Sequence, residues 1–319
     1  MSSNRILWVD NLKGFLILLV VLGHTIQYSM QAFDSSHVFN YIYSFHMPLF
    51  FLISGFVSYK SSLSSTILGG AKKRGVQLLL PYVFWGILFC ILTGMTIERG
   101  LFVSPVFWFL ILLFFISVLM SVCQWVSSRI GWKSEVVCCI MVILLFVIQG
   151  LFKPNFLSLH ILHIHFFFYT IGWYLRKYEA KMLMNWMLIP SAVGFAVLGW
   201  FYQRGAMPSS LSIIPPSIYF LASGIVGSWC FLLLFRRYIN MSLPLLGCIG
   251  RLTLGIYVIH LVACGYCETI MKSLTENSGG VWGVTTLFVV ISIVTILISF
   301  LLSKSKYTCF LIGLKYKFE

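Results

Sequence analysis

The stretch WVDNLKGFLILLVVLGH, residues 8–24, decides the fold class of this chain. It passes from a short polar segment with Asp10 and Lys13 into an apolar run that ends at His24. An apolar helix of about 20 residues is long enough to span the hydrocarbon core of a bilayer. No small-residue cleavage site follows the run, so we expect a retained first transmembrane helix and not a signal peptide.

Apolar runs of this kind recur along the whole chain of 319 residues, of which 60% are hydrophobic and only 9% charged. A soluble domain carries about 25% charged residues, so the composition excludes that class. Polar residues, glycines and prolines separate these runs, and the pattern predicts ten spans. We place them near 12–31, 39–58, 76–97, 105–126, 135–152, 156–175, 184–203, 214–235, 250–271 and 282–303. The expected fold is all-α, a polytopic integral membrane protein with residues 1–319 as a single transmembrane domain.

The basic residues are distributed unevenly between the two sides of these spans. If the N-terminus is cytoplasmic, 18 of the 22 lysines and arginines fall on the inner side. The four on the outer side are Arg99, Lys153, Arg204 and Lys272. This asymmetry predicts ten spans with both termini cytoplasmic. The net charge of +14 follows from the same pattern, because the basic residues lie in short loops between apolar runs. The expected surroundings are therefore membrane lipid, and no nucleic acid partner is expected.

Six of the seven histidines lie inside predicted spans, where ionisable groups are costly and usually functional. His160 lies near the outer surface, as does His37, and the other five lie deeper. His24 falls about 18 Å from the inner boundary, and His260 about 15 Å up the ninth span. His46 falls about 10 Å below the outer boundary, and His163 and His165 about 10–14 Å below it. The sequence therefore predicts a polar chamber toward the outer half of the membrane, suited to proton transfer near neutral pH. The alternative is that each histidine is satisfied separately by a neighbouring helix.

A metal site is the weaker interpretation of the histidines. His160 and His163 share a helical face, but His165 is turned away from both. No Cys, Asp or Glu lies near them in the sequence. The nine cysteines lie mostly within apolar runs, where thiols pack as small hydrophobes. We predict neither a metal nor a disulfide framework.

The first helix gives the chamber a direction. Lys13 and His24 are eleven residues apart, which is within about 20° of three whole helical turns. They therefore share one face, about 16 Å apart along the axis, and Asp10 lies one turn below Lys13. A cation at the cytoplasmic mouth with a base deep on the same stripe suits a long anionic donor, with Asp10 paired to Lys13. The alternative is that Lys13 only snorkels to the interface.

A second cationic cluster, Lys72, Lys73 and Arg74, precedes the third predicted span. Clustered cations bind phosphate groups well. The same residues also satisfy the positive-inside rule as a simple anchor, and the pattern does not separate the two readings.

Six blocks of the sequence together resemble the membrane-bound acyltransferase family 3, in the branch of fucose 4-O-acetylases and related sugar acetyltransferases. They are WVDNLKGFLILLVVLGH at 8–24, FHMPLFFLISGF at 45–56, KKRGVQLLLPYVFW at 72–85, PVFWFLILLF at 105–114, FFFYTIGWYLRK at 166–177 and IGRLTLGIYVIH at 249–260. The resemblance implies an O-acetylating enzyme of the bacterial cytoplasmic (inner) membrane. It implies an acyl-CoA donor, acetyl-CoA first, and a hydroxyl acceptor on a glycan or lipid-linked saccharide, as in polysaccharide modification.

The resemblance also implies roles for single residues. His24 is the expected catalytic histidine, and Lys13, Lys73 and Arg74 are expected to hold the phosphates of the donor. A departure from the family pattern is Gln77, which stands where a second arginine often follows Arg74. Trp108, in the fourth block, is a further candidate site residue.

Two chemistries are compatible with His24: a general base for the acceptor hydroxyl, or a nucleophile that forms an acyl-histidine. Tyr257, His260 or His46 would stabilise the developing oxyanion. The alternative function is a proton-coupled transporter or flippase of a polar solute, which the absence of two matched broken helices disfavours. A non-catalytic scaffold would leave the histidines unexplained. The acceptor sugar, the acyl group and the oligomeric state stay open at this stage.

Overall fold

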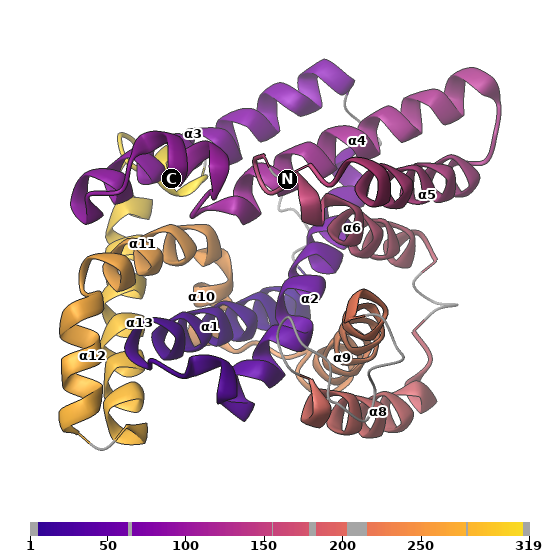
Figure 1. Cartoon of the computed structure of the whole chain (residues 1–319). Helices are drawn as coiled ribbons and strands as arrows, with labels where there is room; N and C mark the ends of the chain where they lie inside the picture. The colour runs from indigo at the N-terminus through magenta and orange to yellow at the C-terminus, as the bar shows by residue number, and fades with distance from the viewer. Residues whose placement is uncertain are drawn as a thin grey trace. The chain divides into compact units, whose positions relative to one another are not determined.

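The computed structural model describes residues 6–62, 66–154, 156–178, 183–202, 216–278 and 280–314. These residues are almost entirely helical, and the described part of the chain contains no strand. The helices are α1 (Leu7–Ser29), α2 (His37–Ser62), α3 (Ile67–Thr93), α4 (Trp108–Ile130), α5 (Ser134–Phe152), α6 (Leu162–Lys177), α8 (Leu188–Phe201), α9 (Pro216–Tyr238), α10 (Pro244–Arg251), α11 (Thr253–Tyr266), α12 (Glu268–Asn277) and α13 (Val281–Lys304) (Figure 1). The all-α class is confirmed.

Seven of the described helices are long and apolar enough to cross a membrane, namely α1, α2, α3, α4, α5, α9 and α13. An eighth crossing is reached if α10 and α11 count as one span. The helices at two other predicted spans, α6 and α8, have only 16 and 14 residues. The chain is therefore a multi-pass membrane protein. A total of ten spans and two cytoplasmic termini remain predictions, and the basic residues Arg5, Lys181, Arg204, Lys315 and Lys317 lie outside the described residues.

The chain divides into two compact units. Unit 1 comprises Met1–Phe50 and Ala180–Leu301, and unit 2 comprises Phe51–Glu179 and Leu302–Glu319. In unit 1, α1 packs against α9, α10, α11 and α12, and α8 packs against α9 (Figure 1). In unit 2, α4 packs against α3, α5 and α6, and the C-terminal 3-10 turn Cys309–Ile312 packs against α3.

Glycine allows α1 and α10 to approach unusually closely in unit 1. A Cβ at Gly250 would lie 1.9 Å from the carbonyl oxygen of Asp10, and one at Gly14 would lie 2.2 Å from that of Leu246. Small residues at helix contacts are the usual means of close packing in membranes, where the hydrophobic effect does not drive helices together. The close contacts at these two glycines hold α10 against α1, just before the chain continues into α11.

The ninth predicted span, 250–271, starts at a bend in the chain. The chain bends by 73° between α10 and α11. At the break, Leu252 ends one helix and starts the next, and the hydroxyl of Thr253 donates a hydrogen bond of 2.6 Å to the carbonyl oxygen of Gly250. The apolar pattern does not reveal such a bend, because Leu252 and Thr253 are both compatible with a helix interior.

The third span also begins earlier than predicted, at Ile67 instead of residue 76. Thr66 caps this helix, with its hydroxyl oxygen accepting from the backbone N–H of Gly69 at 3.2 Å. A threonine at this position is a typical helix N-cap. Lys72, Lys73 and Arg74 consequently lie on the second and third turns of α3 and not in a loop before it.

A polar side chain anchors the start of α1. Asn11, which is 2% exposed, donates hydrogen bonds of 3.0 Å to the carbonyl oxygens of both Ile239 and Met241. These two carbonyls belong to the connection between α9 and α10. One amide group therefore holds the first helix against the segment that leads into the bent pair.

Replacing Asn11 by leucine should destabilise the folded protein. The two carbonyls lose their donor in a partly buried site, which costs roughly 1–3 kcal/mol and lowers the melting temperature by about 5 °C. Thermal unfolding of the purified protein in detergent measures this. The matched control is Asn277→Leu, because Asn277 is an exposed asparagine at the end of α12. Equal melting temperatures for the two variants would contradict the anchoring role.

Candidate active site

His24 and His260 form a direct pair inside unit 1. His24 lies in the fifth turn of α1, and His260 lies in the second half of α11. Nδ1 of His24 is 3.1 Å from Nε2 of His260, and the two ring centroids are 5.1 Å apart. His260 is fully buried, whereas His24 is partly exposed. Two histidines separated by 236 residues in sequence thus meet at hydrogen-bond distance.

The backbone of each helix contributes to this pair. Nδ1 of His24 also lies 3.1 Å from the carbonyl oxygen of Val20, one turn earlier in α1. Nδ1 of His260 lies 2.8 Å from the carbonyl oxygen of Ile256, one turn earlier in α11. Both imidazoles are therefore held in place by their own helices as well as by one another.

His46 and Tyr257 lie close to the pair. The ring of Tyr43 packs edge-on against His46, with centroids 4.8 Å apart, and its centroid is 6.4 Å from that of His24. Nδ1 of His46 lies 2.6 Å from the carbonyl oxygen of Ile42. Tyr257 is buried, and its ring centroid is 5.9 Å from that of His260. His24 thus lies beside His260, and both His24 and His46 lie beside Tyr43. Three of the five deep histidines of the prediction are therefore close together.

Lys13 and Asp10 lie at the start of the same helix. Because α1 runs without interruption from Leu7 to Ser29, the predicted register between Lys13 and His24 holds. Lys13 and Asp10 are both partly exposed. The side chain of Lys13 thus lies about three turns from His24, on the same face of α1.

In unit 2, the second cationic cluster borders a pocket of about 540 Å³. The lining residues are Gly69, Lys72, Lys73, Val76, Gln77, Phe310, Gly313 and Leu314. Arg74 is not among them, and its guanidinium instead donates a hydrogen bond of 3.3 Å to Oε1 of Gln77. The C-terminal wall is held by Trp85, whose indole N–H donates to the carbonyl oxygen of Leu311 at 2.7 Å.

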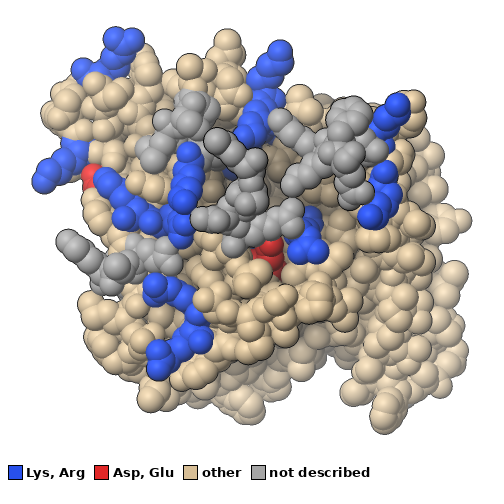
Figure 2. Space-filling model, turned by 180° about the vertical axis from the view of Figure 1, so that it is seen from behind, with Lys and Arg blue, Asp and Glu red and all other residues tan. Residues whose placement is uncertain are grey.

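The sequence had singled out Lys73 and Arg74 for this region. It gave no signal for the contribution of Phe310, Gly313 and Leu314, because these residues follow the last apolar run in a stretch without a recognisable motif. Figure 2 shows one face of the molecule, on which lysine and arginine side chains gather and little acidic surface is seen.

The other two span histidines, His163 and His165, belong to unit 2. The ring of His165 lies nearly parallel to two aromatic rings, with centroids 4.3 Å from Phe51 and 5.4 Å from Trp108. His163 instead meets the ring of Phe146 edge-on at 4.6 Å. Trp108, a candidate site residue, is therefore an aromatic neighbour of His165 in unit 2.

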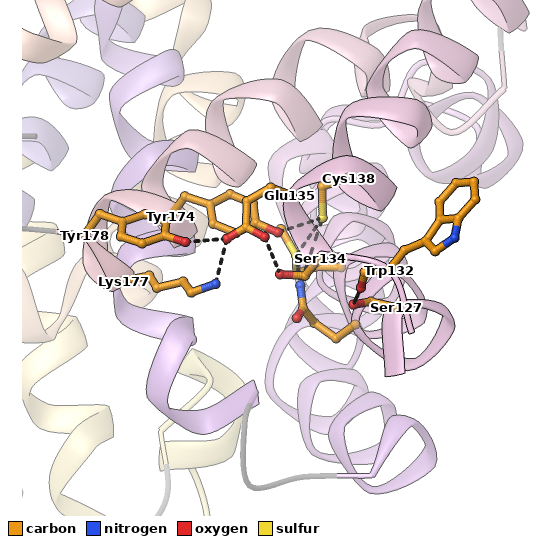
Figure 3. A network of polar contacts seen from close by, with 10 residues as sticks. Ser127, Trp132, Ser134, Glu135, Cys138, Tyr174, Lys177 and Tyr178 are labelled. Atoms are coloured by element: carbon orange, nitrogen blue, oxygen red, sulfur yellow. Dashed lines mark hydrogen bonds and ion pairs between the residues drawn. The ribbon is translucent and has the colours of Figure 1, made fainter. Parts of the chain in front are cut away.

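A further polar network in unit 2 ties α5 to α6 (Figure 3). Glu135 accepts hydrogen bonds of 2.6 Å from both Lys177 and the hydroxyl of Tyr178. One turn later in α5 and one turn earlier in α6, the hydroxyl of Tyr174 donates to Sγ of Cys138 at 3.4 Å. The Glu135–Lys177 ion pair is about one-third exposed, so its role is to align two helix ends and not to supply much stability.

No group of three metal-ligating side chains lies close enough to hold a metal ion among the described residues. All nine cysteines are free thiols, and Cys90, Cys123, Cys138, Cys230, Cys264 and Cys309 are buried.

Comparison with known proteins identifies what the chain is similar to. Residues 6–304 match the family model Acyl_transf_3, described as an acyltransferase domain. Nodulation protein NolL of Mesorhizobium japonicum is 46% identical over 88 residues, and nodulation protein NolL of Sinorhizobium fredii is 42% identical over 88 residues. Each alignment covers 26% of this chain and 24% of the relative, so the chain spans about a quarter of the length of these curated relatives. No solved structure matches the chain.

Proposed function

The chain belongs to the acyltransferase family whose domain it matches from residue 6 to residue 304, and on that premise we propose that it is a membrane O-acyltransferase. The proposed reaction transfers an acyl group, acetyl in the first instance, from acyl-CoA to a hydroxyl of a glycan or lipid-linked saccharide. The proposed location is the bacterial cytoplasmic (inner) membrane. The single observation that carries the site is the contact between His24 and His260, on a helix that also presents Lys13 on the face of His24.

The proposed chemistry starts with His24 as general base. His24 removes the proton from the acceptor hydroxyl, whose oxygen attacks the thioester carbonyl carbon of the donor. The tetrahedral intermediate then breaks its carbon–sulfur bond, and the proton held by His24 passes to the leaving CoA thiolate. The products are the ester and free CoA, and His24 returns to its starting state. The acyl-histidine route is the competing chemistry, in which the same imidazole attacks the thioester first.

The pocket cations Lys72 and Lys73 of unit 2 are the proposed contacts of the donor phosphates. For unit 1, we separately propose Lys13 as a phosphate contact, on the face of α1 that carries His24. Phosphate oxygens form their strongest hydrogen bonds with charged donors, which supports a role for clustered lysines. Arg74 contacts Gln77, which lines the pocket and is the residue that departs from the family pattern. We therefore propose that Arg74 adds positive charge beside the pocket. The apolar wall at Phe310 and Leu314 suits the non-ionic parts of a long donor.

Replacing Lys73 by alanine should raise KM for acetyl-CoA about tenfold or more, with little change in kcat. The loss of one charge-assisted phosphate contact weakens binding of the donor in the ground state and the transition state alike. Steady-state kinetics at saturating acceptor measures both constants. The control is Lys60→Ala, because Lys60 is an exposed lysine at the end of α2 that does not line the pocket. A variant Lys73→Ala with the KM of wild type would remove Lys73 from the donor site.

The bend between α10 and α11 is the observation that favours the alternative function, a proton-coupled transporter or flippase. Broken helices line substrate sites in transporters, usually as two matched breaks in corresponding halves. The described residues contain one such bent pair. Incubating membranes with labelled acetyl-CoA and a saccharide acceptor separates the two functions. Transfer of the label to the acceptor supports the enzyme, whereas solute flux without transfer supports the transporter.

A further inference from the structure

We propose that His260 is a positioning residue that fixes the tautomer of His24, so that Nε2 of His24 is the nitrogen that takes the proton of the acceptor. This inference rests on the proposed function, in which His24 is the base. It assigns His260 a different role from that of an oxyanion donor, and it follows from three distances around two rings.

The first step concerns the hydrogen on His260. A carbonyl oxygen can only accept, so the distance of 2.8 Å between Nδ1 of His260 and the carbonyl oxygen of Ile256 requires a hydrogen on Nδ1. His260 is 0% exposed, and a fully buried site disfavours the charged imidazolium. In the neutral ring the second nitrogen, Nε2, then carries a lone pair and is a hydrogen-bond acceptor.

The second step concerns the hydrogen on His24. Its Nδ1 lies 3.1 Å from Nε2 of His260 and 3.1 Å from the carbonyl oxygen of Val20. Both partners are acceptors, so both contacts require the hydrogen of His24 to be on Nδ1. A neutral His24 with a hydrogen on Nδ1 has its basic lone pair on Nε2. One N–H is shared between the two acceptors, so the tautomer depends on both contacts, and His260 supplies the side-chain acceptor.

The third step concerns the proton after transfer. When Nε2 of His24 takes the acceptor proton, the ring becomes an imidazolium and its Nδ1–H bond to His260 strengthens. His260 cannot pass a proton further, because its own Nδ1–H faces the carbonyl oxygen of Ile256. The proton therefore stays on His24, where it is available for the leaving thiolate. Since both nitrogens of His260 are engaged, His260 is not the donor to the oxyanion.

Three substitutions of His260 test the inference, because they differ in which ring nitrogen they imitate. A glutamine amide reaches the position of Nε2, an asparagine amide reaches only that of Nδ1, and alanine reaches neither. We expect His260→Gln to retain kcat within about tenfold of wild type. His260→Asn and His260→Ala should lose about 10²–10⁴-fold in kcat, with unchanged KM for acetyl-CoA. If His260 had only a structural role, all three variants would have lower melting temperatures, and their activities would fall together for that reason.

Equal kcat losses in all three variants at equal melting temperature, or an effect on KM alone, would overturn the inference. Histidine-selective nitrogen NMR of the wild-type protein provides a test that needs no active variant. The His24 signals are assigned by their loss in His24→Gln, and we expect a protonated Nδ1 and an unprotonated Nε2. The opposite tautomer overturns the inference while leaving the proposed function intact. Absence of acyl transfer by the wild-type protein would instead refute the proposed function.

Discussion

Replacing His24 by alanine is expected to reduce acyl transfer by at least about 10²-fold while leaving the protein folded in the membrane. Removal of a general base costs typically 10²–10⁴-fold in rate. His24 is only partly buried, and its ring lies near those of His260, Tyr28 and Tyr43. The loss should therefore appear in kcat and not in the yield of folded protein. Transfer of label from acetyl-CoA to the saccharide acceptor, with purified protein in lipid vesicles, measures the effect.

The matched control for this prediction is His37→Ala. His37 is the first residue of α2, is exposed and stacks on Trp200 at 4.9 Å between ring centroids. It shares residue type and unit with His24 but lies outside the pair with His260, so its variant should transfer label at nearly the wild-type rate. Undiminished transfer by His24→Ala would exclude His24 as the base.

The kinetic pattern separates the two chemistries in which His24 takes part. A general base requires donor and acceptor to be bound together, so initial-rate plots at several fixed concentrations of one substrate should intersect. An acyl-histidine intermediate would give parallel lines and would leave label on the protein when acceptor is omitted. The tautomer inferred for His24 places Nε2 at the reacting position in both cases, so this measurement is independent of the role of His260.

Much of the fold follows from the sequence, because apolar helices in a membrane are long and uniform. Each predicted span coincides with at least one helix in the described residues, although the described bounds differ by several residues at α1 and α3. The register of Lys13 and His24 also follows from the sequence, since it depends only on the 100° rotation per residue within one helix. The capping threonine at residue 66 was the missed signal that would have extended α3 to include the cations.

The pairing of His24 with His260 could not be predicted as a contact. The sequence placed both histidines at a similar depth, but depth does not say which helices are neighbours. That neighbourhood depends on Gly14 and Gly250, whose role is to have no side chain and which leave no pattern of their own. Asn11 was missed for a similar reason, because a single asparagine at a helix start is common and its two acceptors lie more than 200 residues away.

The second large effect is expected from Gly250→Ala, which should destabilise unit 1. The new Cβ would lie 1.9 Å from the carbonyl oxygen and 2.8 Å from the carbonyl carbon of Asp10. These are backbone atoms of α1, so no side chain can rotate away, and one of the two helices must move. Overpacking of this kind costs typically 1–3 kcal/mol and more where the obstacle is rigid. We expect the melting temperature in detergent to fall by about 6–12 °C.

Gly150→Ala is the control for this substitution. Gly150 lies inside α5, and a Cβ there would meet nothing within 4 Å. Alanine has the higher helix propensity, so this variant should be as stable as wild type or slightly more stable. Equal melting temperatures for Gly250→Ala and Gly150→Ala would contradict the close approach of α1 and α10.

The same substitution should also lower the activity of the molecules that remain folded. α10 leads through the 73° bend directly into α11, and α11 carries His260 to within 3.1 Å of His24 on α1. If α10 is pushed away from α1, the acceptor nitrogen of His260 moves out of hydrogen-bond range before the rest of unit 1 unfolds. Gly250→Ala should therefore lose kcat per folded molecule, as His260→Ala does, at temperatures well below its melting transition. A folded variant with wild-type kcat would show that the α1–α10 contact stabilises the fold without positioning the histidine pair.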